Sequence, residues 1–117
     1  MLTLRKLFSK TYHPLNEIII SKDALLSNYQ YLCSINSDIK VAPVLKSNAY
    51  GHGLKEIASV LDSLDAPFFC VDSLYEGYNL LKAGIKTKIL VLGFSDSRNL
   101  EVKRLPFSYA AFDVAQI

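Results

Sequence analysis

The chain has little of several features that mark whole classes of protein. It holds only two cysteines in 117 residues, Cys33 and Cys70, far apart and without a C-x-x-C pair. This excludes a disulfide scaffold and a zinc knuckle, so we expect no metal site, and two reduced thiols favour the cytoplasm. The net charge is only +2, from 13 basic and 11 acidic residues. That balance is too mild to indicate nucleic acid or an anionic membrane surface as a partner.

Long apolar runs are absent as well. The longest stretches, residues 68–71 and 89–92, are far shorter than the roughly 20 residues that a membrane-spanning helix needs. The first ten residues, MLTLRKLFSK, are basic and lack the apolar centre of a signal sequence. Half of all residues are nevertheless hydrophobic, as in a folded domain. We therefore expect an N-terminal arm over residues 1–16 and one domain over residues 17–117.

Strand-like and helix-like patterns alternate along that domain. Residues 17–20 form a β-branched run, and Asp23 can cap the helix that follows. That helix would carry one apolar stripe of Leu25, Leu26, Tyr29 and Leu32. Further apolar runs lie at 41–45, 68–71, 88–92 and 108–112, and helix patterns lie at 54–64, 73–84 and 95–105. Short apolar strands that alternate with helices predict a parallel sheet covered by helices.

Two of the helix patterns carry specific signals. The segment 54–64 places its apolar residues at helical spacing, at Leu54, Ile57, Ala58, Leu61 and Leu64. Ser73 and Glu76 have the spacing of a capping box, and Gly84 is a typical left-handed helix end. These signals predict an α/β fold, but they fit a barrel and a doubly wound sheet equally well.

The chain is too short for a complete barrel of eight strand–helix units. A complete eight-unit barrel usually takes about 250 residues, whereas this chain of 117 residues holds four strand–helix units at most. Residues 113–117 look like a further strand without a closing helix. We therefore expect a truncated chain, about half of something larger.

Side chains with chemical uses are concentrated after the run 41–45. Lys46 follows it directly, and in a βα-barrel that is the carboxyl end of a strand, where active sites are built. Apolar walls would disfavour the charged ammonium form of this lysine, and a neutral amine can form a Schiff base with an aldehyde. If the next turn is helical, Tyr50 shares a face with Lys46, and its hydroxyl can bind a phosphate. Gly51 and Gly53 let the backbone approach an anion, which free N–H groups of the following helix would attract.

Each of these residues also has an ordinary structural explanation. A lysine at a strand end is usually a solvated charge, and His52 is more often a loop or packing residue than an acid or base. Pro43 is unexpected in a central strand, because it removes a hydrogen-bond donor. The residues by themselves leave both interpretations of Lys46 open.

Residues 46–53, KSNAYGHG, closely resemble the KANAYGHG signature of bacterial alanine racemases, with Ser47 as the single difference. Other segments resemble parts of the same family, namely residues 23–28 (DALLSN), 71–73 with Glu76, 81–85 and 89–93. The resemblance covers most of residues 17–113, but only the N-terminal part of a full enzyme.

The resemblance implies a partial (βα) TIM-type barrel, about its first half, with an N-terminal strand that would pair with an absent β-domain. It implies a pyridoxal-phosphate-dependent alanine racemase, a cytoplasmic homodimer that interconverts L- and D-alanine and supplies D-alanine for peptidoglycan. Lys46 would hold pyridoxal phosphate as a Schiff base and act as one of two bases. Tyr50 would hydrogen-bond the cofactor phosphate, and Leu92 would line the cofactor.

The same resemblance leaves the second base outside the match. In the family it is a tyrosine in the C-terminal domain of the partner subunit, and no part of this chain resembles that region. The alternatives are a racemase for another substrate such as serine, a non-racemising barrel that binds pyridoxal phosphate, and an inactive fragment that folds only by association. Residues 48–53 favour a racemase over the non-racemising barrel. As partners we expect an amino-acid substrate, alanine, and a second subunit in a homodimer of the full-length enzyme, without nucleic acid or membrane.

Overall fold

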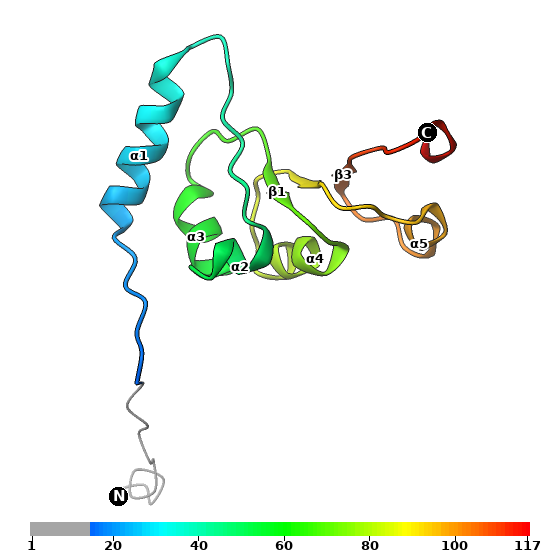
Figure 1. The fold of residues 1–117 in the computed structure, drawn as a ribbon, viewed down its shortest axis with the longest axis horizontal. Coiled ribbons are helices and arrows are strands. Elements are labelled where there is room, and N and C mark those ends of the chain that lie inside the picture. Colours follow the sequence, from blue (N-terminus) through cyan, green and yellow to red (C-terminus); the bar gives the residue numbers. More distant parts are fainter. Residues whose placement is uncertain (1–14) are drawn as a thin grey trace, which may run out of the picture.

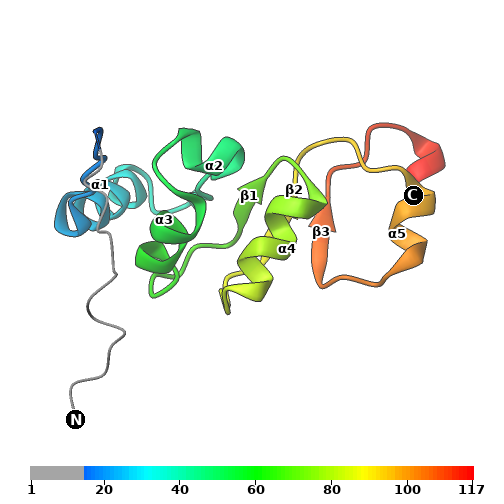
Figure 2. The same ribbon diagram turned by 90° about the horizontal axis from the view of Figure 1, so that it is seen from below.

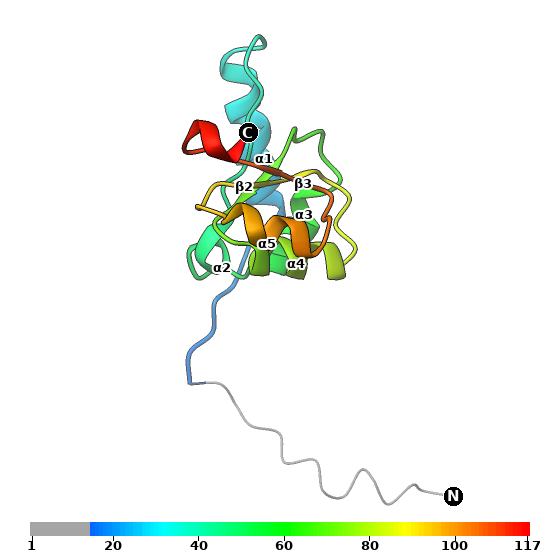
Figure 3. The ribbon, with the colours of Figure 1, turned by 90° about the vertical axis from the view of Figure 1, so that its right-hand side faces the viewer.

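A three-stranded parallel sheet lies at the centre of the computed structural model, which describes residues 15–117. Its strands are β1 (Phe69–Val71), β2 (Ile89–Val91) and β3 (Phe107–Tyr109). The helices α4 (Leu74–Lys82) and α5 (Ser97–Val102) connect them, and both lie on the same side of the strands (Figure 3). The predicted parallel α/β fold is confirmed. The arm expected at 1–16 falls, up to residue 14, outside the described residues.

The order of the strands decides between the two architectures that composition left open. The sheet runs β1-β2-β3 in chain order, with Phe69 opposite Ile89 and Ile89 opposite Phe107. A parallel bridge between Val44 and Cys70 adds one more segment beside β1. Figure 2 shows α1, α3, α4 and α5 following one another in chain order across the molecule. A doubly wound sheet would reverse its order at a switch point, so this sequential order favours barrel-type units.

The core lies between the sheet and the helices α3 (Leu54–Leu61) and α4. Phe69, Val71, Leu80 and Val91 are its largest fully buried side chains. The predicted stripe of α3 is buried as expected at Leu54, Ile57, Ala58 and Leu61, whereas Leu64 follows the helix and is only partly buried. Burying a side chain such as Phe or Leu contributes about 1.5–3 kcal/mol, so this apolar contact is the main stabilising term.

The first helix, α1 (Lys22–Ile35), differs from expectation at both ends. Ser21 caps it by accepting a hydrogen bond from the Ala24 N–H at 3.3 Å, so the prediction of Asp23 as the cap is wrong. Its far end stands clear of the other helices (Figure 1), and Leu32 of the predicted stripe is 51% exposed. Tyr29 is buried and donates its hydroxyl to the Val41 carbonyl at 3.0 Å. Burial, with a smaller effect of Cys33, raises the pKa of Tyr29 to about 12, so this hydroxyl stays a donor at neutral pH.

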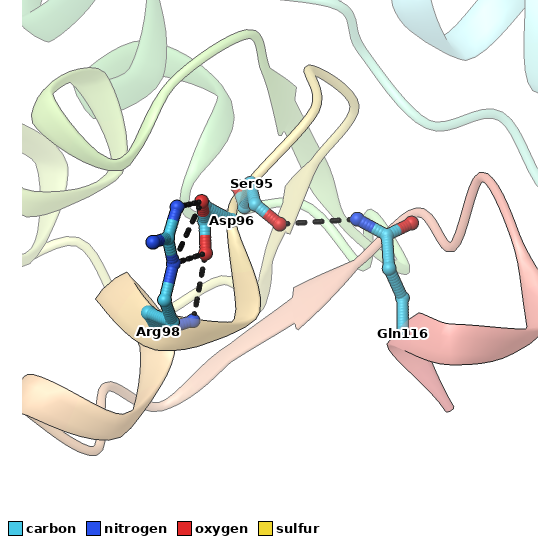
Figure 4. A network of polar contacts seen from close by, with 4 residues as sticks. All are labelled: Ser95, Asp96, Arg98 and Gln116. Atoms are coloured by element: carbon cyan, nitrogen blue, oxygen red, sulfur yellow. Dashed lines mark hydrogen bonds and ion pairs between the residues drawn. The ribbon is translucent and has the colours of Figure 1, made fainter.

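Two segments predicted as strands form none. Residues 17–20 pair with nothing in the described part of the chain, and Ile19 is 82% exposed. A strand needs a partner for its backbone N–H and C=O groups, which explains the difference. Within 113–117, η2 (Val114–Gln116) is a 3₁₀-helix. The Gln116 side chain accepts from the Phe112 N–H at 2.6 Å, which turns the segment back on itself. It also donates to the Ser95 carbonyl at 3.1 Å (Figure 4).

The helix expected at 95–105 is shorter than its pattern. It begins after Asp96, whose carboxylate accepts from the Arg98 N–H at 2.9 Å and pairs with the Arg98 guanidinium (Figure 4). These hydrogen bonds hold the pKa of Asp96 below its ordinary value. The Ser73 cap and the Gly84 end predicted for α4 are confirmed, because Ser73 Oγ accepts from the Glu76 N–H at 3.2 Å and Gly84 has φ of 81°. The other half of the predicted capping box differs, since Glu76 Oε2 accepts from the Asp72 N–H and not from the Ser73 N–H.

Cys33 and Cys70 are both free, and burial raises the pKa of the Cys70 thiol. Over residues 15–117, the structure contains no helix that is both long and apolar enough to cross a membrane.

The carboxylate of Asp62, at the end of α3, should make the fold less stable in acid. Burial alone raises the pKa of its carboxyl, but hydrogen bonds from the Thr87 N–H and hydroxyl, both 2.8 Å, and from the Lys86 N–H outweigh it. The net pKa is lowered, so the carboxylate stabilises the fold above the unfolded value of about 4 and loses that effect as pH falls through the folded value. Urea unfolding from pH 7 to pH 2 should show this loss.

The matched comparison for Asp62 is an exposed carboxylate. Asp62→Asn should remove part of the acid dependence, because the amide keeps one acceptor but has no charge to lose. Asp38→Asn changes a residue whose backbone N–H, not its carboxylate, is hydrogen-bonded. Equal acid dependence in the wild type and Asp62→Asn would contradict this assignment.

Candidate active site at the carboxyl edge of the sheet

Lys46 lies where the sequence predicted, immediately after a strand-like segment. The Leu45 N–H donates to the Cys70 carbonyl at 2.7 Å, and the Cys70 N–H donates to the Pro43 carbonyl at 2.8 Å. Pro43 has no N–H to add, and the segment 41–45 forms a single bridge at Val44 and not the full strand that was expected. Lys46 therefore projects from the carboxyl edge, next to β1.

The turn that follows is left-handed. Ser47, Asn48, Ala49 and Tyr50 all have φ between 51° and 56°, although none of them is glycine. The helical turn that was the condition for Tyr50 to share a face with Lys46 is therefore present, but it is left-handed. A left-handed conformation costs a non-glycine residue roughly 1–2 kcal/mol, so contacts around the turn must hold it.

Several hydrogen bonds supply that support. The Ala49 N–H donates to the Leu45 carbonyl at 2.8 Å, and Ala49 itself is buried. Asn48 Oδ1 accepts from the Leu54 N–H at 2.8 Å, so the turn also caps α3. The Leu54 N–H, expected to be free for an anion, is thus already in use. Gly51, with φ of 90°, ends the left-handed run at its C-cap, and backbone strain of this kind gathers at functional sites.

The surroundings of Lys46 are more polar than expected. Its side chain is 40% exposed, and its Nζ lies 4.0 Å from Oδ1 of Asp72, which is 59% exposed. An amine that is 40% exposed beside a carboxylate differs from the apolar surroundings that were expected. An exposed ion pair of this kind adds little to the stability of the fold. The Asp72 carboxylate matters here because it lies close to the Lys46 amine.

The other two predicted residues also lie at or near this edge. Leu92 follows β2 directly, is partly buried, and donates its N–H to the Val71 carbonyl at 2.8 Å. Tyr50 ends the left-handed turn and is 62% exposed. The structure thus brings Lys46 and Leu92 to the carboxyl ends of two parallel segments, the bridged segment 41–45 and β2, with Tyr50 four residues beyond Lys46.

His52 has a local role. Its Nδ1 lies 2.8 Å from the Ala49 carbonyl, and its ring lines a groove of about 510 Å³ between α1, α3 and residues 41–45. Lys46 and Tyr50 are not among the residues that line this groove. In the described part of the chain, no group of three His, Cys, Asp or Glu side chains is placed to hold a metal ion.

Sequence reasoning missed two contributors to this edge, Asp72 and the carboxylate of Glu76. Glu76 was expected to complete the capping box, but its Oε2 accepts from the Asp72 N–H at 2.9 Å and its Oε1 from the Asn48 N–H at 3.4 Å. The spacing from Ser73 located Glu76 on the helix, but no local pattern could reveal a contact across 28 residues.

Comparison with known proteins points to one family. Residues 20–116 match the family described as "Alanine racemase, N-terminal domain". A serine/alanine racemase of Enterococcus gallinarum is 42% identical over 85 residues, which is 72% of this chain and 12% of that protein. An alanine racemase of Staphylococcus carnosus is 40% identical over 84 residues, which is 72% of this chain and 22% of that protein.

Solved structures agree with the sequence comparison. The alanine racemase from Oenococcus oeni matches with a TM-score of 0.64 and 33% identity, covering 70% of this chain and 24% of that one. The alanine racemase from E. faecalis matches with a TM-score of 0.64 and 32% identity, covering 71% and 23%. The chain therefore spans about a quarter or less of the proteins it is compared with here.

Proposed function

The chain belongs to the family of alanine racemase N-terminal domains, and on this premise we propose that it is the cofactor-holding part of a pyridoxal-phosphate-dependent alanine racemase. Its four parallel segments would form about the first half of a TIM-type barrel, within a domain over residues 17–117. The observation that carries the proposal is Lys46, placed at the carboxyl edge of the sheet at the start of a left-handed turn. The reaction would interconvert L- and D-alanine for peptidoglycan, in a cytoplasmic homodimer.

The residues at this edge fit pyridoxal phosphate chemically. Lys46 offers a solvent-accessible primary amine, which an aldehyde group requires. Tyr50 offers an exposed phenol that can donate to a phosphate oxygen. Leu92 offers a partly buried apolar side chain directly after β2. These three residues would hold the cofactor.

Bound pyridoxal phosphate draws electrons from the α-carbon of an amino acid and makes the α-proton removable. Lys46 Nζ would take or return that proton on one face of the α-carbon. The Asp72 carboxylate, with its Oδ1 4.0 Å from Nζ, would help to orient this amine. Inversion also needs a base on the opposite face, which the family resemblance places in a partner subunit.

Serine is the second candidate substrate. The relative with 42% identity is named a serine/alanine racemase. This name supports serine as a candidate substrate in addition to alanine. The relatives named here are racemases, which supports a racemase over a non-racemising barrel that only binds the cofactor.

We expect Lys46 to be the lysine that pyridoxal phosphate modifies. The chain is incubated with pyridoxal phosphate, reduced with borohydride and mapped by peptide mass spectrometry. The label should concentrate on Lys46 and disappear in Lys46→Ala, while the exposed Lys82 and Lys88 serve as internal controls. Label spread evenly over these lysines would contradict the proposal.

We expect Tyr50→Phe to weaken the binding of pyridoxal phosphate and to leave proton transfer at the bound cofactor unchanged. Loss of one hydrogen bond to a charged group costs roughly 1.5–3 kcal/mol, or about tenfold to a hundredfold in the dissociation constant of pyridoxal phosphate. Tyr75→Phe is the matched control, because Tyr75 is an exposed tyrosine on α4. A loss of α-proton exchange at full cofactor occupancy, with unchanged affinity, would instead give Tyr50 a role in proton transfer.

A further inference from the structure

One carboxylate joins the two loops beside Lys46. Glu76 lies in the first turn of α4, is half-buried, and reaches back across the edge of the sheet. Its Oε2 accepts from the N–H of Asp72 at 2.9 Å, and its Oε1 accepts from the N–H of Asn48 at 3.4 Å. Asp72 follows β1, whereas Asn48 belongs to the left-handed turn after Lys46. A single side chain therefore spans loops that follow two adjacent segments of the sheet.

The contact falls on the strained part of the backbone. Asn48 has φ of 56° and ψ of 43°, a conformation that a non-glycine residue keeps only where its surroundings hold it. The turn is supported from within by the bonds of Ala49 and of the Asn48 side chain. Glu76 supports it from outside, and hydrogen bonds to a charged acceptor are the stronger kind. The shorter hydrogen bond, from the Asp72 N–H, fixes the position of the Glu76 carboxylate. The longer one, from the Asn48 N–H, connects that carboxylate to the left-handed turn.

We propose that Glu76 is a positioning residue, whose carboxylate holds the Asn48 and Asp72 amides so that Lys46 and Tyr50 are presented together at the sheet edge. This inference rests on the proposed function of Lys46. Glu76 acts on the amine by two routes, since it fixes the turn that follows Lys46 and the backbone of Asp72, the residue whose carboxylate lies 4.0 Å from Nζ.

Glutamine separates this role from a merely structural one. It has the size of glutamate and a similar helix propensity, so packing and helix formation are retained. Its amide has one acceptor oxygen and one NH₂ donor. Whichever way the amide is turned, the NH₂ group faces one of the two backbone N–H groups. Glu76→Gln should therefore fail to replace glutamate at the turn while the fold persists.

The first measurement follows the Asn48 amide by NMR in the ¹⁵N-labelled chain. In the wild type its signal should move as acid protonates the acceptor carboxylate, and this movement should persist in Asp72→Asn but vanish in Glu76→Gln. The amides of β1 should be unchanged in both variants, which shows that the sheet remains folded. An acid-induced movement that survives in Glu76→Gln, or a Glu76→Gln chain that is unfolded, would overturn the proposal.

The second measurement uses pyridoxal phosphate and borohydride. The ratio of label at Lys46 to label at Lys82 and Lys88 should fall by about tenfold or more in Glu76→Gln, the effect of one charged hydrogen bond. Glu101→Gln, at an exposed glutamate of α5, should keep the wild-type ratio. A preference for Lys46 that is equal in the wild type and Glu76→Gln overturns the role of Glu76. No preference in the wild type contradicts the proposed function instead, and the Asn48 signal then decides about Glu76.

Discussion

Gly93→Ala should destabilise the fold by about 3 kcal/mol or more, at the upper end of what overpacking costs. A Cβ atom at Gly93 would lie 2.0 Å from the backbone carbonyl oxygen of Asp72. Backbone cannot rotate out of the way as a side chain does, so the loops after β1 and β2 would have to separate. Because both loops end at the proposed site, the same change should displace Asp72 and Leu92.

Thermal and urea unfolding of the chain measure this effect. Gly84→Ala is the matched control, since Gly84 has φ of 81° but a Cβ atom added there would meet nothing within 4 Å. It should cost only the strain of one left-handed residue, roughly 1–2 kcal/mol. Equal destabilisation by the two variants would show that the close approach at Gly93 carries no special weight.

The second large effect concerns turnover by the polypeptide of 117 residues. Given pyridoxal phosphate and L-alanine, we expect it to form no D-alanine at the rate of an ordinary enzyme, roughly 1–10³ per second. By the proposal Lys46 would supply one base, and the resemblance places the other in a region that these residues do not match. A positioned acid or base contributes about 10²–10⁴-fold, so one-sided proton exchange is the most that should remain.

The open sheet should lower the rate further. Within residues 15–117, β3 pairs on one side only, with β2, and the Lys46 side chain is 40% exposed. Water at the amine weakens the electrostatic effects that a closed site provides, and unpaired strand edges invite association. Chiral chromatography of the product measures the outcome, with Lys46→Ala as the blank. Turnover at an ordinary enzymatic rate would show that the second base and the closed barrel are not required.

The buried core is evidence on the alternative that the chain is a fragment which folds only by association. The core around Phe69, Leu80 and Val91 is buried within a single copy, which favours folding of the central part without a partner. The exposed apolar residues lie mainly outside that core, for example Ile19, Leu32 and Ile117.

Several features could be predicted from the sequence because they depend on neighbours in the chain. The stripe of α3, the Ser73 cap and the Gly84 helix end need only residues within about one or two helical turns. The alternation of short apolar runs with helices likewise predicts a parallel sheet. The position of Lys46 after a segment that lies parallel to β1 follows from the same pattern. The KSNAYGHG motif points to the family without any knowledge of the fold.

The tertiary structure decided whatever depends on partners far along the chain. Residues 17–20 have strand composition but pair with no edge in the described part of the chain, so their composition alone produces no strand. The handedness of the turn at 47–50 could not be predicted, because local preference opposes it and distant groups such as the Glu76 carboxylate support it. The polar surroundings of Lys46 depend on Asp72, which β1 carries to the same edge. Sequence determines local hydrogen bonding and apolar spacing, whereas strand pairing, strained turns and the charges around an amine are determined by the residues that the fold brings together.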